Sequence, residues 1–109
     1  MATTAKKWQT TLNVVGSIVT VVTAPSTGSQ ISSINIMNTN ASVDRVVSLY
    51  VGGAGSSVSN LWGVWTVPFN QNLLITLPNS PIVLGNAETI RMCQDTSTDV
   101  TVTLCGLDM

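Results

Sequence analysis

The acidic residues are the first candidates for chemistry, because a carboxylate can act as a general acid, a general base or a metal ligand. The chain carries five of them: Asp44, Glu88, Asp95, Asp99 and Asp108. A glycosidase needs two facing carboxylates, one of them in a setting that raises its pKa. Nothing in the stretch PIVLGNAETIRM marks Glu88 as that acid. We expect it to be a surface residue that begins a strand after a turn, with Gly85 and Asn86 supplying positive φ angles.

The sequence contains no histidine, the commonest general base, metal ligand and partner of a nucleophile. Asp95 and Asp99 flank a turn, where an aspartate usually hydrogen-bonds its own backbone, and their spacing matches no calcium loop. The glycine-rich residues 52–55 lack a lysine and lead into no helix, so they do not form a phosphate loop. We therefore predict no catalytic residue, no metal site and no cofactor, and a protein that is not an enzyme.

The two cysteines, Cys93 and Cys105, are expected to be free thiols. A final hairpin that turns at Ser97 would set Cys93 opposite Thr101, and Cys105 opposite Thr89, so the two sulfur atoms would not meet. Free thiols agree with synthesis in the cytosol, and the N-terminus MATTAKKWQTT has no apolar segment typical of a secretory signal. No apolar run is long enough to predict a membrane span.

Charged residues make up only 8% of the chain, against about 25% in a typical soluble domain. The formal charge is −1, and Lys6 and Lys7 are the only adjacent basic residues, so the sequence predicts no nucleic-acid binding. We expect this pair to lie in a flexible N-terminal arm, residues 1–7. A surface with so few charges tends to associate unless neighbours cover it, which favours a protein that works inside an assembly.

Alternation of apolar and polar residues predicts strands along most of residues 8–109, which we interpret as one domain. Ile34 and Ile36 share one face, and so do the apolar residues of two later strands, Val47, Leu49 and Val51 in one and Val100, Val102 and Leu104 in the other. Gly16-Ser17 separates two strands and indicates either a hairpin or a bend in one long strand. The prediction is an all-β fold, an antiparallel β-sandwich or jelly roll of about eight strands.

The segment LWGVWTVPF, residues 61–69, is the strongest functional signal. In a strand, Trp62 and Trp65 point to opposite faces, so one indole can lie in the core while the other is exposed. Tryptophan is enriched at interface hot spots and also stacks on sugar rings and nucleobases. Three interpretations stay open here: two core residues, a protein–protein contact, or a ligand-stacking site.

The order of motifs resembles the small β-sandwich structural proteins of tailed-bacteriophage virions. A strand ends in VVTAP and is followed by ISSINIMNTN and VSLYVGG, then by PIVLGNAETIRM and a last strand VTVTLCGLDM. The match runs from Thr20 to the C-terminus.

The resemblance implies a non-enzymatic virion protein that is assembled in the host cytoplasm, most often a capsid cement or decoration protein that bridges subunits of the head shell. The implied partners are the major capsid protein or other virion proteins, and a homotrimer is the implied oligomer. A tail or head–tail component and a carbohydrate- or receptor-binding β-sandwich module are the alternatives. The expected interface residues are Trp8, Trp62, Trp65, Phe69, Lys6 and Lys7.

Overall fold

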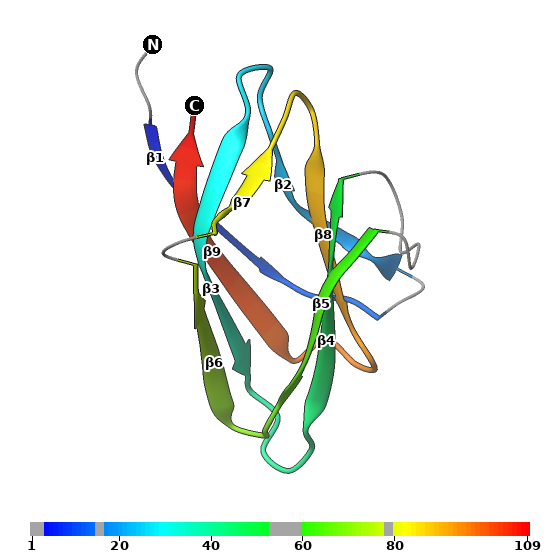
Figure 1. The fold of residues 1–109 in the computed structure, drawn as a ribbon. Helices are drawn as coiled ribbons and strands as arrows, with labels where there is room; N and C mark the ends of the chain where they lie inside the picture. Colours follow the sequence, from blue (N-terminus) through cyan, green and yellow to red (C-terminus); the bar gives the residue numbers. More distant parts are fainter. Residues whose placement is uncertain (1–3, 15–16, 53–59, 78–79) are drawn as a thin grey trace.

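The computed structural model describes residues 4–14, 17–52, 60–77 and 80–109, which form nine strands in two antiparallel sheets (Figure 1). The first sheet, here called sheet A, has the strand order β1-β9-β3-β6, and β7 also pairs with β3. Its strands are β1 (Thr4–Thr11), β9 (Val100–Asp108), β3 (Ser29–Asn38), β6 (Gln71–Thr76) and β7 (Ile82–Leu84). The described residues contain no helix long and apolar enough to cross a membrane.

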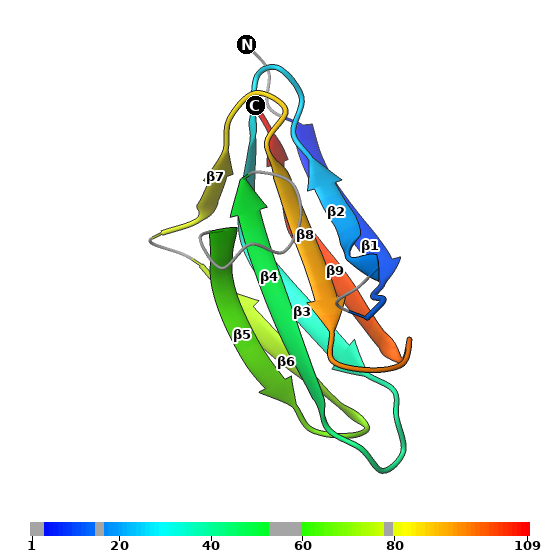
Figure 2. The ribbon, with the colours of Figure 1, turned by 90° about the vertical axis from the view of Figure 1, so that its right-hand side faces the viewer.

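The second sheet, sheet B, packs against the first and has the order β2-β8-β4-β5 (Figure 2). Its strands are β2 (Val19–Thr23), β8 (Thr89–Gln94), β4 (Arg45–Gly52) and β5 (Leu61–Val67). The two sheets make an elongated sandwich of 47 × 25 × 21 Å. The predicted all-β antiparallel sandwich is therefore confirmed, with nine strands among the described residues.

The core lies between the sheets. It consists of the apolar side chains that the alternation of apolar and polar residues predicted to face inward. Ile34 and Ile36 of β3 are fully buried, as are Val102 and Leu104 of β9. The facing layer comes from sheet B, with the inward residues Val47, Leu49, Ile90 and Met92. Strand residues alternate between the two faces of a sheet. The residues next to these buried ones in each strand therefore lie on the outer face of the sandwich.

The short connections mostly join one sheet to the other. Of the described strands, β4 and β5 are the only consecutive pair that hydrogen-bond side by side. β1 pairs with β9, and β2 pairs with β8, so of the two interpretations of Gly16-Ser17, a hairpin or a bend in one long strand, the hairpin is wrong; residues 15 and 16 themselves lie outside the described residues. The final hairpin is wrong for the same reason, because β8 lies in sheet B and β9 in sheet A. Cys93 stands opposite Ser48, and both cysteines are free.

The turn between β7 and β8 is a corner of the sandwich, and Glu88 holds it. Its carboxylate Oε1 accepts a hydrogen bond from the Gly85 N–H at 2.6 Å, and its own N–H donates to the Gly85 carbonyl at 3.2 Å. Glu88 is exposed and directly precedes β8, as expected. The positive φ angle of this turn belongs to Ala87, at 59°, so the prediction for Gly85 and Asn86 is wrong.

Candidate interaction surface

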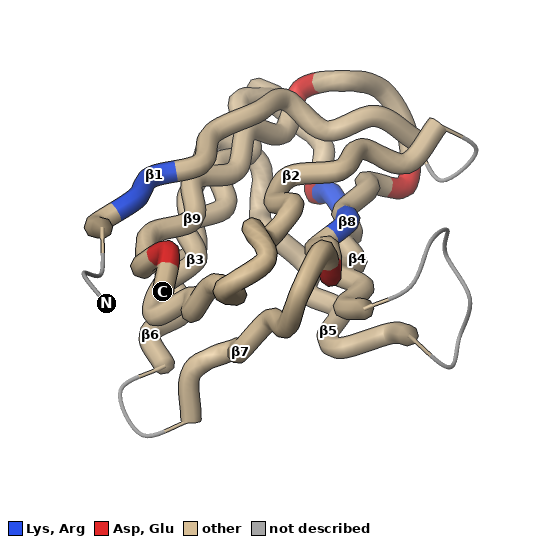
Figure 3. The backbone as a smooth tube through the Cα atoms, turned by 90° about the horizontal axis from the view of Figure 1, so that it is seen from above, with Lys and Arg blue, Asp and Glu red and all other residues tan. Residues whose placement is uncertain are grey.

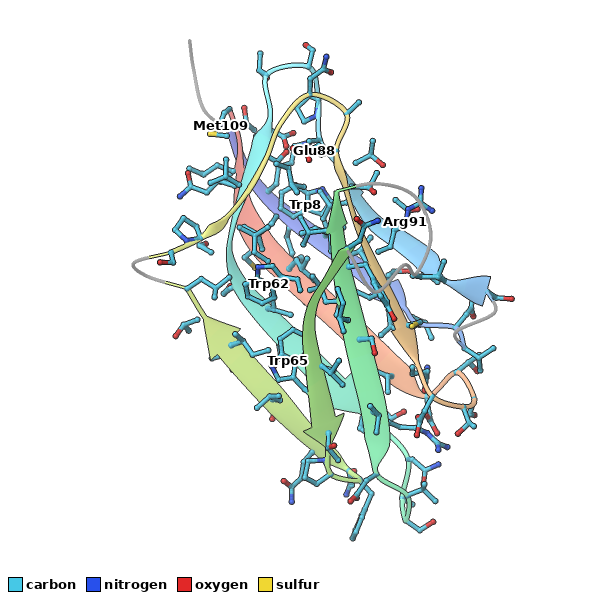
Figure 4. All side chains as sticks on the ribbon, turned by 45° about the vertical axis from the view of Figure 1, so that its right-hand side comes forward. Trp8, Trp62, Trp65, Glu88, Arg91 and Met109 are labelled. Carbon is cyan, nitrogen blue, oxygen red and sulfur yellow. The ribbon has the colours of Figure 1, made fainter. Side chains whose placement is uncertain are left out.

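Trp62 and Trp65 lie together on β5, one of the two edge strands of sheet B. Their ring centroids are 6.1 Å apart and their planes are tilted by 45°. Trp62 is 43% exposed, whereas Trp65 is half-buried and packs against the core. Figure 4 shows both indoles on the side where β5 and β6 face each other across the sandwich. The two residues therefore close this open side, with Trp65 inside and Trp62 at the surface.

A β-bulge explains why two residues expected on opposite faces meet. Gly63 pairs with Leu49 and Leu61 pairs with Tyr50, so the register shifts at Trp62, which has no direct partner on β4. Bulges re-aim side chains and are frequent at sheet edges. Gly63 also makes room, because a Cβ there would lie 2.7 Å from Cζ2 of Trp65. The indole of Trp65 can thus lie directly over the backbone of its own strand.

Phe69 lies in the turn from β5 to β6, where the chain passes from sheet B to sheet A. Its ring is exposed, and its N–H donates to Oδ1 of Asp44 at 3.0 Å. The next residue, Asn70, has a positive φ of 53°, which completes the turn. The backbone around Phe69 is held in place while its ring remains accessible.

The remaining expected contact residues lie on β1, at the opposite edge of sheet A. Trp8 pairs with Leu104 of β9 and is half-buried against the core. Nζ of Lys6 is 3.5 Å from Oδ2 of Asp108, and Lys7 is exposed opposite Cys105. Residues 4–7 of the expected arm are thus paired strand, while residues 1–3 lie outside the described residues. The structure therefore divides the six expected residues into two groups on two edges.

A feature that the motif analysis missed is the distribution of charge. No residue from 46 to 87 is charged, and these residues include β5, β6, β7 and most of β4. Figure 3 shows β5, β6 and β7 without an acidic or basic residue. The same strands expose large apolar side chains: Leu61, Trp62, Val64, Leu74 and Val83. We call these five residues the apolar edge, and the gap in charge along the sequence was the signal that pointed to it.

A cluster of charged residues at the β3–β4 and β8–β9 connections is a second feature that sequence reasoning missed. Arg45 donates from Nε to Oδ1 of Asp99 at 2.8 Å and from Nη2 to Oδ2 at 3.0 Å. Asn40 donates to the same carboxylate at 2.8 Å. These bonds, led by that from Arg45, lower the pKa of Asp99 to about 2. The cluster fastens the β8–β9 connection to the start of β4 and is a structural clamp.

The described part of the chain forms no pocket, and within it no three His, Cys, Asp or Glu side chains gather as a metal site would require. The exposed large apolar side chains of the described residues are those of the apolar edge, Phe69, Val14, Val43 and Val46.

Comparison with known proteins gives the fold and no family. No protein-family model and no curated protein matches the chain. The solved structure of PirA is similar, with a TM-score of 0.51 and 12% identity, over 94% of this chain and 92% of that one. A protein of the Bacillus endospore appendages, which form disulfide-linked pili, has a TM-score of 0.51 and 11% identity, over 96% and 84%. A chain of the cyanophage Pam1 capsid has a TM-score of 0.41 and 14% identity, over 96% and 84%. At these identities the similarity to the first two establishes a shared sandwich fold, and the function has to be argued from the surface of this chain.

Proposed function

We propose that the protein is a non-enzymatic structural component of a phage virion, and specifically a cement or decoration protein on the head shell. The observation that carries this proposal is the apolar edge. Large side chains of β5, β6 and β7 are exposed on a part of the molecule that has no charge. A concentration of exposed large apolar side chains on strands that carry no charge is typical of an interaction site. A permanent place in an assembly covers it.

The two edges of the sandwich suit a protein that bridges subunits. Trp62 supplies an exposed indole that Trp65 supports from below, and Phe69 adds an exposed ring at the β5–β6 turn. Lys6, Lys7 and the half-buried Trp8 lie on β1, at the other edge of sheet A. Within the proposal, each edge contacts a different neighbour, the major capsid protein among them. Contacts made on two sides lock a joint that either contact alone would leave free to open.

Labelling of virus particles tests the proposal directly. Antibodies raised against the purified protein should decorate the heads of particles made by the virus that encodes this chain, at many sites per head. Labelling confined to the tail or the neck would transfer the protein to that structure, and absence from the particles would overturn the virion proposal. Heads that lack the protein should also release their genome at a lower temperature than complete heads.

A second candidate function, a carbohydrate- or receptor-binding module, is favoured by the exposed indole of Trp62. Indole rings stack on the apolar faces of sugars, and a tilted neighbour such as Trp65 could complete one wall of a shallow site. Titration of the isolated protein with sugars would then change its tryptophan fluorescence, and Trp62→Ala would abolish the change. A cement protein would show no response to sugars.

A further inference from the structure

Among the described edge strands, β6 is the one whose sequence and geometry leave it open to another strand. Sheet edges are usually blunted by charged side chains, prolines, bulges or short length, because a regular open edge accepts a further strand. β1 carries Lys6 and Lys7, β2 and β5 each contain a register shift, and β7 has three residues and follows Pro81. β6 has six residues in unbroken register with β3, and it contains no charge and no proline.

The pairing with β3 determines which backbone groups of β6 point outward. At the end of this ladder, the N–H of Leu77 donates to the carbonyl of Ser32 at 2.9 Å. Every second pair of an antiparallel ladder exchanges hydrogen bonds, so the odd-numbered residues of β6 are bonded to β3. The N–H and C=O groups of Asn72, Leu74 and Thr76 consequently point away from β3. Figure 1 shows β6 at one side of the molecule, with no described strand beyond it.

This row of outward backbone groups is complementary to itself. When two copies of β6 lie antiparallel with their centres at Leu74, Leu74 faces Leu74 of the other copy, and Asn72 faces Thr76. Each of these positions then meets a position whose donor and acceptor also point outward, so the ladder between the copies is complete. The three side chains are exposed, and they form one apolar pair and two polar pairs without like charges. Leu74, which is 60% exposed, is covered by its own counterpart.

We propose that two copies of this protein pair through β6 about a two-fold axis at Leu74, which joins their A sheets into one continuous antiparallel sheet. A two-fold contact uses the same surface on both copies, and the outward row of β6 meets that requirement. Residues 46–87 carry no charge, and a net charge of −1 repels a second copy only weakly. The inference goes beyond the proposed function, and a two-fold pair differs from the homotrimer that the resemblance implies.

Proline substitution tests the backbone pairing. Leu74→Pro removes the central donor of the contact and leaves the ladder with β3 intact, because that N–H points outward. Leu74→Thr is the matched control, since it also removes the apolar side chain but keeps the N–H. Sedimentation and light scattering should show a dimer for the wild type. The Leu74→Pro dimer should be at least about tenfold weaker than that of Leu74→Thr, because an acceptor on each copy loses its donor.

Cysteine cross-linking tests the register, in a background that carries Cys105→Ser. The Cα atoms of a hydrogen-bonded antiparallel pair lie about 5.5 Å apart, a separation that a disulfide spans. Leu74→Cys should therefore link two copies when oxidised glutathione is added. Asn72→Cys alone and Thr76→Cys alone should not, because each then lies far from its own counterpart, whereas a mixture of these two variants should form the link. A disulfide between two copies of Asn72→Cys would contradict the register.

The remaining outcomes are also decisive. Equal dimers of Leu74→Pro and Leu74→Thr would show a contact made by side chains and would overturn the strand pairing. A wild type that is monomeric at its highest soluble concentration would do the same, and would leave the edge to a strand of another protein. Thermal unfolding verifies that each variant is folded, and Thr76→Pro repeats the test at another outward N–H should Leu74→Pro fail to fold.

The measurement contains no virion component, so it is separate from the test of the proposed function. A monomeric protein whose antibodies still label virus heads would end the inference of a β6 pair and leave the cement proposal standing. A β6 dimer that is absent from virus particles would do the opposite.

Discussion

The indole of Trp62 rests against that of Trp65, with 6.1 Å between the ring centroids and a 45° tilt between the planes. Trp65 packs against the core, so it fixes the position of the more exposed ring before any partner arrives. A side chain held in its binding position loses less conformational entropy on association. The β-bulge at Trp62 and the missing side chain of Gly63 together allow this arrangement.

Alanine substitutions at the two tryptophans should separate folding from association. Trp65→Ala removes a ring that packs against the core and should lower the free energy of unfolding by about 3 kcal/mol. Trp62→Ala removes mainly the contact between the two rings and should cost about 1 kcal/mol, while it weakens binding to neighbours. Urea denaturation gives the first quantity, and association of the folded variants gives the second. Equal losses of stability at the two positions would instead make Trp62 a core residue.

Local alternation predicted the strands well, because the inward and outward faces of a strand are determined by neighbouring residues. Ile34 and Ile36 are buried as the pattern required, and so are Val102 and Leu104. The partner of each strand was not predictable in the same way. A turn such as residues 95–99 suits both a hairpin and a crossing between sheets, and the choice depends on packing against strands distant in sequence.

The candidate surface was predictable only in part. The sequence allowed one of Trp62 and Trp65 to be exposed but left open that both lie in the core, and the bulge that brings their rings together has no local signature except Gly63. The clamp between Arg45 and Asp99 joins residues far apart in the chain, and it followed from no motif. Glu88 is a surface residue after a turn, as predicted, but its hydrogen bonds with Gly85 followed from no motif.

Gly106 should tolerate no side chain. It lies on β9 beside the irregular part of β3, where the register shifts between Ile31 and Ser33. A Cβ at this position would lie 1.9 Å from the carbonyl oxygen of Gln30, and this neighbour is backbone that cannot swing away. Gly106→Ala should therefore lower the free energy of unfolding by about 3 kcal/mol. Gly85→Ala is the control, because its closest neighbour is the flexible end of Glu88; similar losses in both variants would contradict the steric argument.

The two thiols should differ in reactivity toward an alkylating reagent in the native state. Cys93 is buried in β8, and burial raises the pKa of its thiol, so little reactive thiolate forms. Cys105 lies on the outer face of β9 and is half-buried. Mass spectrometry should show one adduct at Cys105 well before the second, which appears only on unfolding. Rapid modification of Cys93 in the folded protein would mean that β8 opens readily.

The clamp at Asp99 should make stability depend on pH in the acid range. The pKa of Asp99 is lowered to about 2 in the folded protein, mainly by the hydrogen bonds from Arg45, whereas an unfolded aspartate has a pKa of about 3.9. A group whose pKa is lower in the folded state stabilises that state when ionised. The contribution of Asp99 is therefore fully present above about pH 4, and it disappears as the pH falls through about 2.

Asp99→Asn should consequently lower the melting temperature by several degrees at pH 7, because Arg45 is left with no carboxylate at that position. The difference from the wild type should shrink steadily between about pH 4 and pH 2, where the wild-type carboxylate becomes protonated. Asp95→Asn is the matched control. Asp95 lies in the same β8–β9 connection, and its own carboxylate accepts a hydrogen bond from the N–H of the adjacent Thr96. Calorimetry of the three proteins across this range decides the matter. A difference at Asp99 that stayed constant down to pH 2 would show that the loss comes from shape and hydrogen bonding, and that the ionised pair contributes nothing.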